Sequence, residues 1–180
     1  MIFVDSGAWY ALKDPDDQYH KDALSFYEEL KKGKYGTLVT TDYVIDEAST
    51  LLMARKGINL ATTLLDEILH SKKSIHLVWM NQELFNTTVS IFKASGDKGW
   101  SFTDCTSFEV MHRMEINEAF AFDWHFTEAG FNRFSGRHHK STTEGSQRLG
   151  QYQNDQVLER KKKVIVDASR VEKWFPTLLP

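Results

Sequence analysis

Short apolar runs alternate along the chain with longer stretches in which apolar residues recur every three or four positions. Such runs are typical of buried strands, and they lie at residues 2–5, 38–40, 75–79 and 119–122. The helical spacing between them is carried by four sets: Ala23, Tyr27 and Leu30; Val44, Ala48, Leu51 and Leu52; Leu60, Leu64, Leu65 and Ile68; and Phe85, Val89 and Phe92. Strands that alternate with helices predict an α/β fold, with a mainly parallel sheet covered on both faces.

The pattern changes near residue 135. Residues 135–153 are rich in Gly, Ser, Thr, Gln and His and show no periodicity, which is typical of a linker. Residues 164–175 then show the pattern of a strand followed by a short helix. We therefore expect one domain over residues 1–134 and a C-terminal extension over residues 135–180, in which the role of Asp167 is open.

The composition favours a cytoplasmic protein that does not enter a membrane. Its 180 residues suit one domain with an appendage, and no apolar run approaches the roughly 18 residues that a membrane span needs. Asp5 interrupts the first apolar run, so we expect no signal peptide. Cys105 is the only cysteine, which excludes an intramolecular disulfide and fits a reducing compartment.

Charge is distributed unevenly between the two parts of the chain. Residues 1–134 carry 13 Lys or Arg and 20 Asp or Glu, a balance of −7, whereas residues 135–180 carry 9 and 5, a balance of +4. An acidic domain is unusual for a protein that binds nucleic acid through basic patches alone. It is better explained if several of the acids surround cations, which restore a positive potential.

Two aspartates follow predicted strands. Asp5 ends the first strand, before the helix expected from Ser6, and Asp123 follows the run at residues 119–122. In an open parallel sheet, the carboxyl ends of the strands form the crevice where ligands bind. A single aspartate at such a place is commonly a helix cap, but two that reach the same edge by separate routes favour a shared site.

Two further carboxylates lie on predicted helix faces that also carry apolar residues. Glu47 comes three residues after Val44 and four before Leu51, so we expect it to face inward with them. An inward carboxylate costs several kcal/mol of desolvation unless something pairs with it. Asp104 precedes Phe108 by four residues on one face, although the helix dipole also favours an acid in a first turn.

Separated carboxylates of this kind fit the oxygen ligands that Mg²⁺ and Mn²⁺ prefer. Such ions keep several waters and bind phosphate oxygens, so they serve phosphodiester hydrolysis without a covalent nucleophile on the protein. A site for a softer metal is poorly supported, because there is one cysteine and no His-x-x-x-His pair in a helical pattern.

Four blocks of sequence surround these acids. They are Phe3-Val4-Asp5-Ser6, Ile45-Asp46-Glu47, Ser101-Phe102-Thr103-Asp104-Cys105-Thr106-Ser107-Phe108 and Ala121-Phe122-Asp123-Trp124-His125-Phe126. Each alone is weakly specific, but in this order and spacing they resemble the signature motifs of PIN-domain ribonucleases over residues 1–134. The third and fourth blocks are similar to those of VapC-type toxins of prokaryotic toxin–antitoxin pairs.

This resemblance implies a three-layer α/β/α sandwich and Mg²⁺- or Mn²⁺-dependent endonucleolytic cleavage of RNA. It also implies a homodimer and a small antitoxin protein that covers the site. Ser6 and Thr103 match polar positions beside the first and third acids, where they would orient metal-bound waters or cap helices. The positions that match the family's catalytic, metal-binding acids are Asp5, Glu47, Asp104 and Asp123.

Three other functions remain open from sequence alone. The chain could be a housekeeping RNA-processing nuclease of the same family, a non-catalytic PIN-like module that holds RNA or protein, or a phosphatase-like hydrolase. The presence of all four acids argues against the non-catalytic module. Phosphatases of this architecture commonly carry Asp-x-Asp after the first strand, whereas Gly7 stands here in place of the second aspartate.

Other polar residues have simpler structural interpretations. We expect Cys105 to lie in the core and His125 to cap the short helix after Asp123 rather than to contact phosphate. Asp16 or Asp17 should cap the following helix. The side chains expected to be exposed in the extension are His138, His139 and Lys161–Lys163, of which the lysines are candidates for weak RNA contact.

Overall fold

The computed structural model describes residues 1–71 and 73–134, and these contain a five-stranded sheet. Its strands lie side by side in the order β3-β2-β1-β4-β5, and every pairing is parallel. The predicted α/β class with a mainly parallel sheet is therefore confirmed. The strands are β1 (Ile2–Val4), β2 (Leu38–Thr41), β3 (Ile75–Val78), β4 (Glu118–Phe120) and β5 (Asn132–Phe134).

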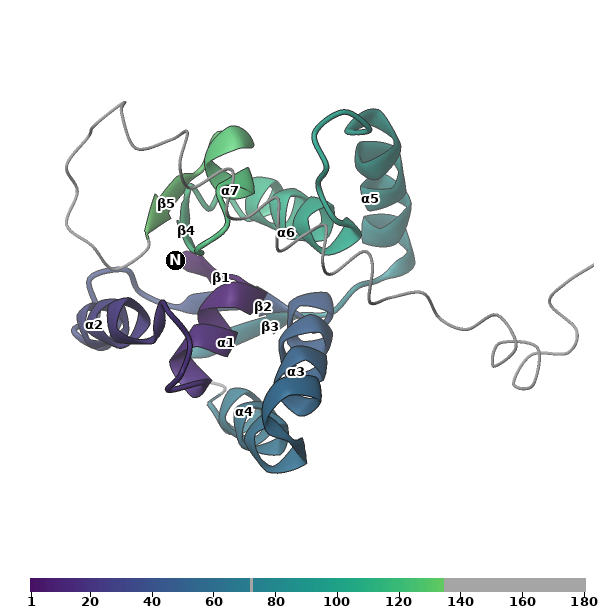
Figure 1. Cartoon of the computed structure of the whole chain (residues 1–180). Helices are drawn as coiled ribbons and strands as arrows, with labels where there is room; N and C mark the ends of the chain where they lie inside the picture. Colours follow the sequence, from purple (N-terminus) through teal and green to yellow (C-terminus); the bar gives the residue numbers. More distant parts are fainter. Residues whose placement is uncertain (72, 135–180) are drawn as a thin grey trace, which may run out of the picture. The chain divides into compact units, whose positions relative to one another are not determined.

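Helices follow the strands and cover the sheet on both faces, as Figure 1 shows. Phe26 of α2 packs on Phe120 from one side, with ring centroids 4.9 Å apart. Phe126 of α7 packs on Phe3 from the other side, where Phe108 of α6 lies 5.1 Å from it. The helices are α1 (Ser6–Lys13), α2 (His20–Lys31), α3 (Asp42–Lys56), α4 (Ile58–His70), α5 (Gln82–Ala94), α6 (Phe102–Arg113) and α7 (His125–Glu128).

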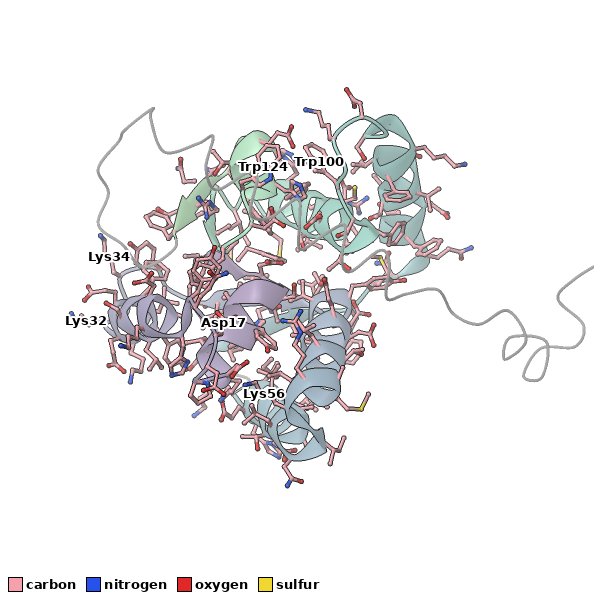
Figure 2. The ribbon with its side chains drawn as sticks, viewed as in Figure 1. Asp17, Lys32, Lys34, Lys56, Trp100 and Trp124 are labelled. Carbon is pink, nitrogen blue, oxygen red and sulfur yellow. The ribbon has the colours of Figure 1, made fainter. Side chains whose placement is uncertain are left out.

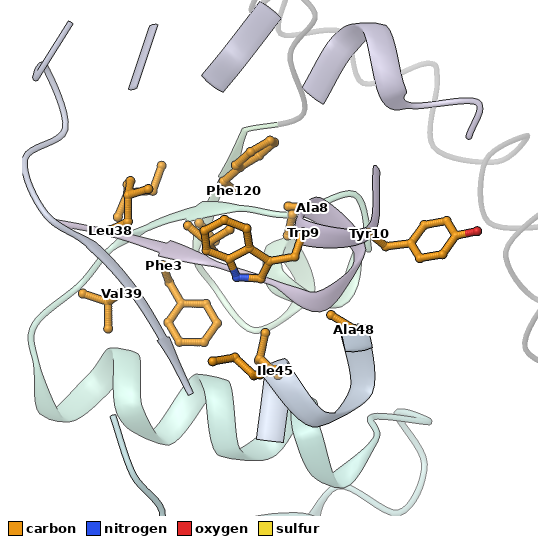
Figure 3. Close-up of a cluster of buried hydrophobic side chains, with 14 of the residues drawn as sticks. Phe3, Ala8, Trp9, Tyr10, Leu38, Val39, Ile45, Ala48 and Phe120 are labelled. Atoms are coloured by element: carbon orange, nitrogen blue, oxygen red, sulfur yellow. The ribbon is translucent and has the colours of Figure 1, made fainter. Parts of the chain in front are cut away.

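The core is built around β1, the central strand, whose three residues are completely buried. Successive side chains of a strand point to opposite faces. Figure 3 shows Phe3 and Val39 directed toward one face and Leu38 and Phe120 toward the other. A continuous apolar run such as Ile2-Phe3-Val4 is what a strand buried on both faces requires.

Two strands differ from their predicted form because they lie at the edges of the sheet. The predicted strand at residues 75–79 ends at Val78, and Trp79 is 66% exposed rather than buried. The fifth strand, Asn132–Phe134, was not predicted, since its residues are polar or half-buried and show no apolar run. Strand β4, between β1 and β5, ends at Phe120, two residues earlier than expected.

The predicted apolar face of α5 is wrong. Leu84 and Thr88 are the buried residues of this helix, whereas Phe85 and Phe92 are 41% and 43% exposed. Both rings instead contact Phe102 at the start of α6, with centroids 5.4 and 5.7 Å apart. The helix packs against α6 at the edge of the domain. It therefore buries a narrower row of side chains than the apolar pattern of the sequence predicts.

The expected cap of α2 is also wrong. The helix begins at His20, and its N-cap, Tyr19, makes no side-chain capping bond. Asp17 accepts a hydrogen bond from the Tyr19 backbone in the preceding turn (2.8 Å). Within residues 1–71 and 73–134, no helix has the length and apolar character of a membrane span.

Some expectations concern parts of the chain outside the described residues. They are the linker-like segment 135–153, the strand and helix at 164–175, Asp167, His138, His139 and Lys161–Lys163.

Candidate active site

Asp5 lies where β1 passes into α1, at the carboxyl edge of the sheet. It is 6% exposed and is the N-cap of α1, since its Oδ2 accepts a hydrogen bond from the Gly7 backbone at 3.3 Å. Its own backbone N–H donates to the Phe120 carbonyl oxygen on the neighbouring strand (3.0 Å). The end of β4 therefore fixes the place of Asp5 directly.

Asp104 occupies the first turn of α6 and is held in a capping box with Ser101. The Ser101 backbone donates to Asp104 Oδ2 at 2.7 Å, and Ser101 Oγ accepts from the Asp104 backbone at 3.0 Å. Asp104 thus caps its helix, as the dipole interpretation expects. Its side chain is nevertheless only 13% exposed to solvent, as the inward interpretation expects.

Asp123 follows β4 at a distance of three residues and begins the turn into α7. Its Oδ1 accepts a hydrogen bond from the His125 backbone at 2.9 Å, and its side chain is 35% exposed. Trp100, beside the N-cap of α6, donates its indole N–H to Glu128 of α7 at 2.7 Å. This bond ties the segments that carry Asp104 and Asp123, near Trp100 and Trp124 in Figure 2.

Glu47 reaches the same region from α3. It is half-buried, as the inward orientation predicts, whereas its neighbour Asp46 is exposed. Thr41, at the end of β2, caps α3 by accepting a hydrogen bond from the Val44 backbone at 3.1 Å. The second strand thus positions Glu47 one and a half turns into its helix.

The other three acids all lie close enough to Asp5 to affect its pKa. Burial raises the pKa of Asp5 well above its ordinary value, and the negative charges of Asp104, Glu47 and Asp123 raise it further. A backbone hydrogen bond from Ser6 acts in the opposite direction. A carboxyl group that is both desolvated and surrounded by like charges is a frequent feature of functional sites.

His125 is a site residue that the sequence interpretation missed. Its Nδ1 lies 3.4 Å from Asp104 Oδ2 and 3.3 Å from Asp123 Oδ1, and its side chain is 12% exposed. Burial lowers the pKa of His125, but the nearby Asp104, Asp123 and Glu128 outweigh burial and raise it. The expected capping role is wrong, because α7 begins at His125 itself and Trp124 is the N-cap.

Arg133 of β5 was also missed. Its Nη1 donates to the Phe122 carbonyl oxygen at 2.9 Å, immediately before Asp123. Burial raises the pKa of Asp123, and the positive charges of His125 and Arg133 partly reverse this rise. No sequence signal pointed to Arg133, because β5 has no apolar run and was not predicted.

The two supporting residues each adjoin an acid in the chain. Ser6 is the first residue of α1, and Thr103 precedes Asp104 in α6; both are half-buried. Cys105 is buried, as expected, and burial raises the pKa of its thiol.

The acids fit a hard divalent cation held partly by water and substrate. Within the described part of the chain, no three His, Cys, Asp or Glu side chains are grouped closely enough to hold a metal ion by themselves. Mg²⁺ usually takes only one or two carboxylates and completes its coordination with waters and phosphate oxygens. An all-oxygen donor set, with repulsion that a cation would relieve, matches this mode of binding.

Comparison with known proteins agrees with this geometry. Residues 2–132 match the PIN domain. The chain belongs to the PIN-domain family. Over 131 residues it is 30% identical to the 23S rRNA-specific endonuclease VapC20 of Mycobacterium tuberculosis. This match covers 73% of this chain and 95% of that protein. It is also 26% identical over 114 residues to a VapC ribonuclease of Archaeoglobus fulgidus (63% and 71%).

Solved structures support the same assignment. The crystal structure of M. tuberculosis VapC20, described as a sarcin-ricin loop cleaving toxin, superposes with a TM-score of 0.65 at 30% identity, over 73% of this chain and 96% of that one. FitAcB from Neisseria gonorrhoeae gives a TM-score of 0.56 at 12% identity (77% and 100%), which shows a shared fold alone. The predicted membership in the PIN family and the resemblance to VapC-type toxins are confirmed.

Proposed function

We propose that this protein is a divalent-metal-dependent endoribonuclease of the VapC type and the toxin of a toxin–antitoxin pair. The observation that carries the proposal is the environment of Asp5, a buried carboxylate whose pKa is raised by burial and by three other acids. Like charges at a buried position are costly unless a cation compensates them. A PIN domain with this arrangement has the means to hold the metal that RNA hydrolysis needs.

The four acids would share the work of holding the ion, and each is oriented by its own element. Backbone N–H groups fix three of the carboxylates at helix N-termini, so these groups need little reorganisation when substrate arrives. When bound, Mg²⁺ or Mn²⁺ supplies a Lewis acid that activates water and offsets charge at the leaving oxygen. The proposed ligands are Asp5, Glu47, Asp104 and Asp123, with Ser6 and Thr103 in support.

The proposed substrate is an unpaired loop of a structured RNA. A relative that is 30% identical over most of the domain is named as a 23S rRNA-specific endonuclease, so ribosomal RNA is the first substrate to try. Bases in loops are unstacked and accessible, whereas the bases of an A-form duplex are hard to reach. The cytoplasm is where we expect the protein to meet such RNA.

Cleavage and metal binding test this proposal together. Purified protein should cut ribosomal RNA with Mg²⁺ or Mn²⁺ and lose activity in EDTA. Asp5→Asn, Glu47→Gln and Asp104→Asn should each lower kcat by at least about 100-fold, since each loses a charged ligand and keeps its shape. Asp46→Asn, an exposed neighbour of Glu47, is the matched control and should cleave like the wild type.

A binding measurement separates ligand loss from misfolding. Metal that binds only the native state raises its melting temperature, so Mg²⁺ should stabilise the wild type more than Asp104→Asn. Full activity in EDTA would contradict the metal-dependent mechanism. Equal metal-induced shifts in the two proteins would remove Asp104 from the proposed ligand set.

One protein partner follows from the proposed role: we infer a small antitoxin that covers the acids. Expression of the wild type should arrest growth, whereas expression of Asp5→Asn should not. Co-expression of the antitoxin should relieve the arrest. A housekeeping nuclease would cause no such arrest. A non-catalytic module would bind RNA with no turnover in any metal.

We also propose a homodimer that uses the aromatic cluster formed by Phe85, Phe92 and Phe102. The first two side chains are exposed and pack on the third at the α5–α6 surface. Exposed apolar side chains gathered in one place mark interaction sites on soluble proteins, and two copies of one apolar patch can cover each other. Light scattering should give twice the chain mass, and Phe85→Glu with Phe92→Glu should give the monomer mass.

A further inference from the structure

Arg133 is a half-buried cation that the acid cluster does not require as a ligand. It lies on β5, an edge strand whose register pairs it with Ala119 of β4. Its Nε is buried and has no hydrogen-bond partner among the described residues. Burial lowers the pKa of Arg133, while the charge of Asp123 raises it. A desolvated guanidinium at this position is costly for a residue that only fills space.

The bond that Arg133 does make is directed at the main chain next to Asp123. Its Nη1 donates to the Phe122 carbonyl oxygen at 2.9 Å. The same short segment is held at two other points: the Ala121 backbone donates to the Phe134 carbonyl oxygen at 3.2 Å, and the Tyr19 ring stacks on Phe122 at 4.4 Å. Strand β5 thus fixes the peptide that precedes the fourth acid.

Asp123 needs such a restraint to stay close to the other acids. Asp123 lies three residues beyond the end of β4 and has no place in the regular part of the sheet. It is also repelled by Asp104, which is one of the causes that raise its pKa. Without a restraint, the turn that carries Asp123 could move its carboxylate outward, away from the other acids. A main-chain bond to a rigid strand opposes that movement.

We propose that Arg133 is a positioning residue for Asp123, which holds the β4–α7 turn so that the fourth carboxylate faces the metal-binding acids. The proposal rests on the proposed function, because it assumes that these acids bind a divalent ion. Arg133 acts through the Phe122 carbonyl and does not contact the ion itself. Residues that orient metal ligands in this way commonly alter metal affinity by about 10- to 100-fold when they are changed.

Charge and position predict opposite results, which makes the inference testable. Loss of a positive charge near the site should, through electrostatics alone, tighten the binding of a cation. If Arg133 positions Asp123, its loss should weaken binding instead. The measurement is the Kd for Mn²⁺ by isothermal titration calorimetry on the full chain, together with the Mn²⁺ concentration that gives half-maximal cleavage.

Arg133→Gln should raise the Kd for Mn²⁺ and the half-saturating Mn²⁺ concentration by about tenfold. The kcat at saturating Mn²⁺ should remain within about twofold of the wild type, because a high metal concentration selects the competent orientation of Asp123. A residue with only a structural role would lower the melting temperature without altering either metal constant. Arg113→Gln, which removes an exposed arginine paired with Glu83 and Glu109, is the matched control.

Arg133→Lys keeps the charge but cannot reproduce the reach of the planar guanidinium. It should raise both metal constants by at least about threefold, and it decides the matter if Arg133→Gln fails to fold. Unchanged or tighter Mn²⁺ binding in a folded Arg133 variant would overturn the inference. A wild type that binds no Mn²⁺ would overturn the proposed function itself, so the two failures are distinct.

Discussion

At the scale of single residues, Asp5 has two roles that oppose each other in the free energy of folding. It stabilises α1 as an N-cap, through the bond from the Gly7 backbone. It is also a buried carboxylate among three others, so its ionised form is disfavoured in the metal-free protein. The helix cap and the proposed metal ligand are thus the same side chain.

The raised pKa of Asp5 predicts how stability depends on pH in the absence of metal. The native state holds this proton more tightly than the unfolded chain, so its contribution is present at a pH below 3.8 and is lost as the pH rises through the native pKa. Asp5→Asn cannot ionise and remains a good N-cap. In EDTA at pH 7 it should therefore melt at least about 2 °C above the wild type.

Melting curves from pH 4 to pH 8 test this prediction. The difference between Asp5→Asn and the wild type should shrink as the pH falls toward 4, because the native state takes up the Asp5 proton at a higher pH than the unfolded chain does. Added Mg²⁺ should reverse the order at pH 7, because the ion stabilises only the protein that has the ligand. A variant that is less stable than the wild type at pH 7 in EDTA would show that capping outweighs repulsion.

At the scale of elements, a small polar network joins α1 to α3 on the side away from the acids. Asp14, the C-cap of α1, is 3% exposed; it accepts hydrogen bonds from Tyr10 at 2.6 Å and from Lys56, the last residue of α3, at 2.8 Å. Figure 2 shows Lys56 at this end of α3. Since α1 begins at Asp5 and α3 carries Glu47, the network sets the relative placement of two proposed ligands.

Asp14→Ala should lower the free energy of unfolding by about 2 kcal/mol, because Tyr10 and Lys56 lose a buried charged partner. Burial raises the pKa of Asp14, but its hydrogen bonds outweigh burial and lower it. Its contribution is therefore present above pH 3.8 and is lost as the pH falls through the native pKa. Asp16→Ala, which loses an 86% exposed partner of Lys56, should cost at most about 0.5 kcal/mol.

Urea denaturation at pH 7 and pH 4 measures both variants. If Asp14→Ala and Asp16→Ala cost the same amount, the network is no more than a surface ion pair. Cleavage by Asp14→Ala at 25 °C should show the same Mg²⁺ dependence as the wild type, as long as the protein stays folded.

At the scale of the whole molecule, we expect residues 1–134 to carry out the chemistry and residues 135–180 to add positive charge. The family match ends at residue 132, and all four acids precede it. The first part has a balance of −7 and the extension +4. Because phosphate contacts by Lys and Arg depend strongly on salt, we expect the extension to contribute nonspecific attraction to RNA rather than catalysis.

Truncation after Phe134 tests this division. The shortened protein should fold and cleave with unchanged kcat, while its affinity for RNA falls by a few fold at low salt and less at high salt. Filter binding at two salt concentrations and single-turnover cleavage measure the two effects. A folded truncated protein that is inactive at saturating RNA would instead assign Asp167 or its neighbours to the site.

The sequence by itself determined the α/β class and four of the five strands of the sheet, and it pointed to the four acids that we propose as metal ligands. These depend on local periodicity and on residues placed next to strand ends, and both are properties of neighbours in the chain. The run Ile2-Phe3-Val4 shows this plainly, because a strand buried on both faces needs three consecutive apolar residues. The inward position of Glu47 follows from helical spacing in the same way.

The tertiary structure alone decided what lies at the edges and between the elements. Trp79, Phe85 and Phe92 carry an apolar pattern, yet they are exposed because β3 and α5 lie at the border of the domain. His125 reaches the acids from a one-turn helix, and Arg133 reaches the peptide before Asp123 from a short edge strand; neither element has a periodicity that predicts it. Contacts between residues distant in the chain depend on which elements become neighbours, and local pattern does not encode that choice.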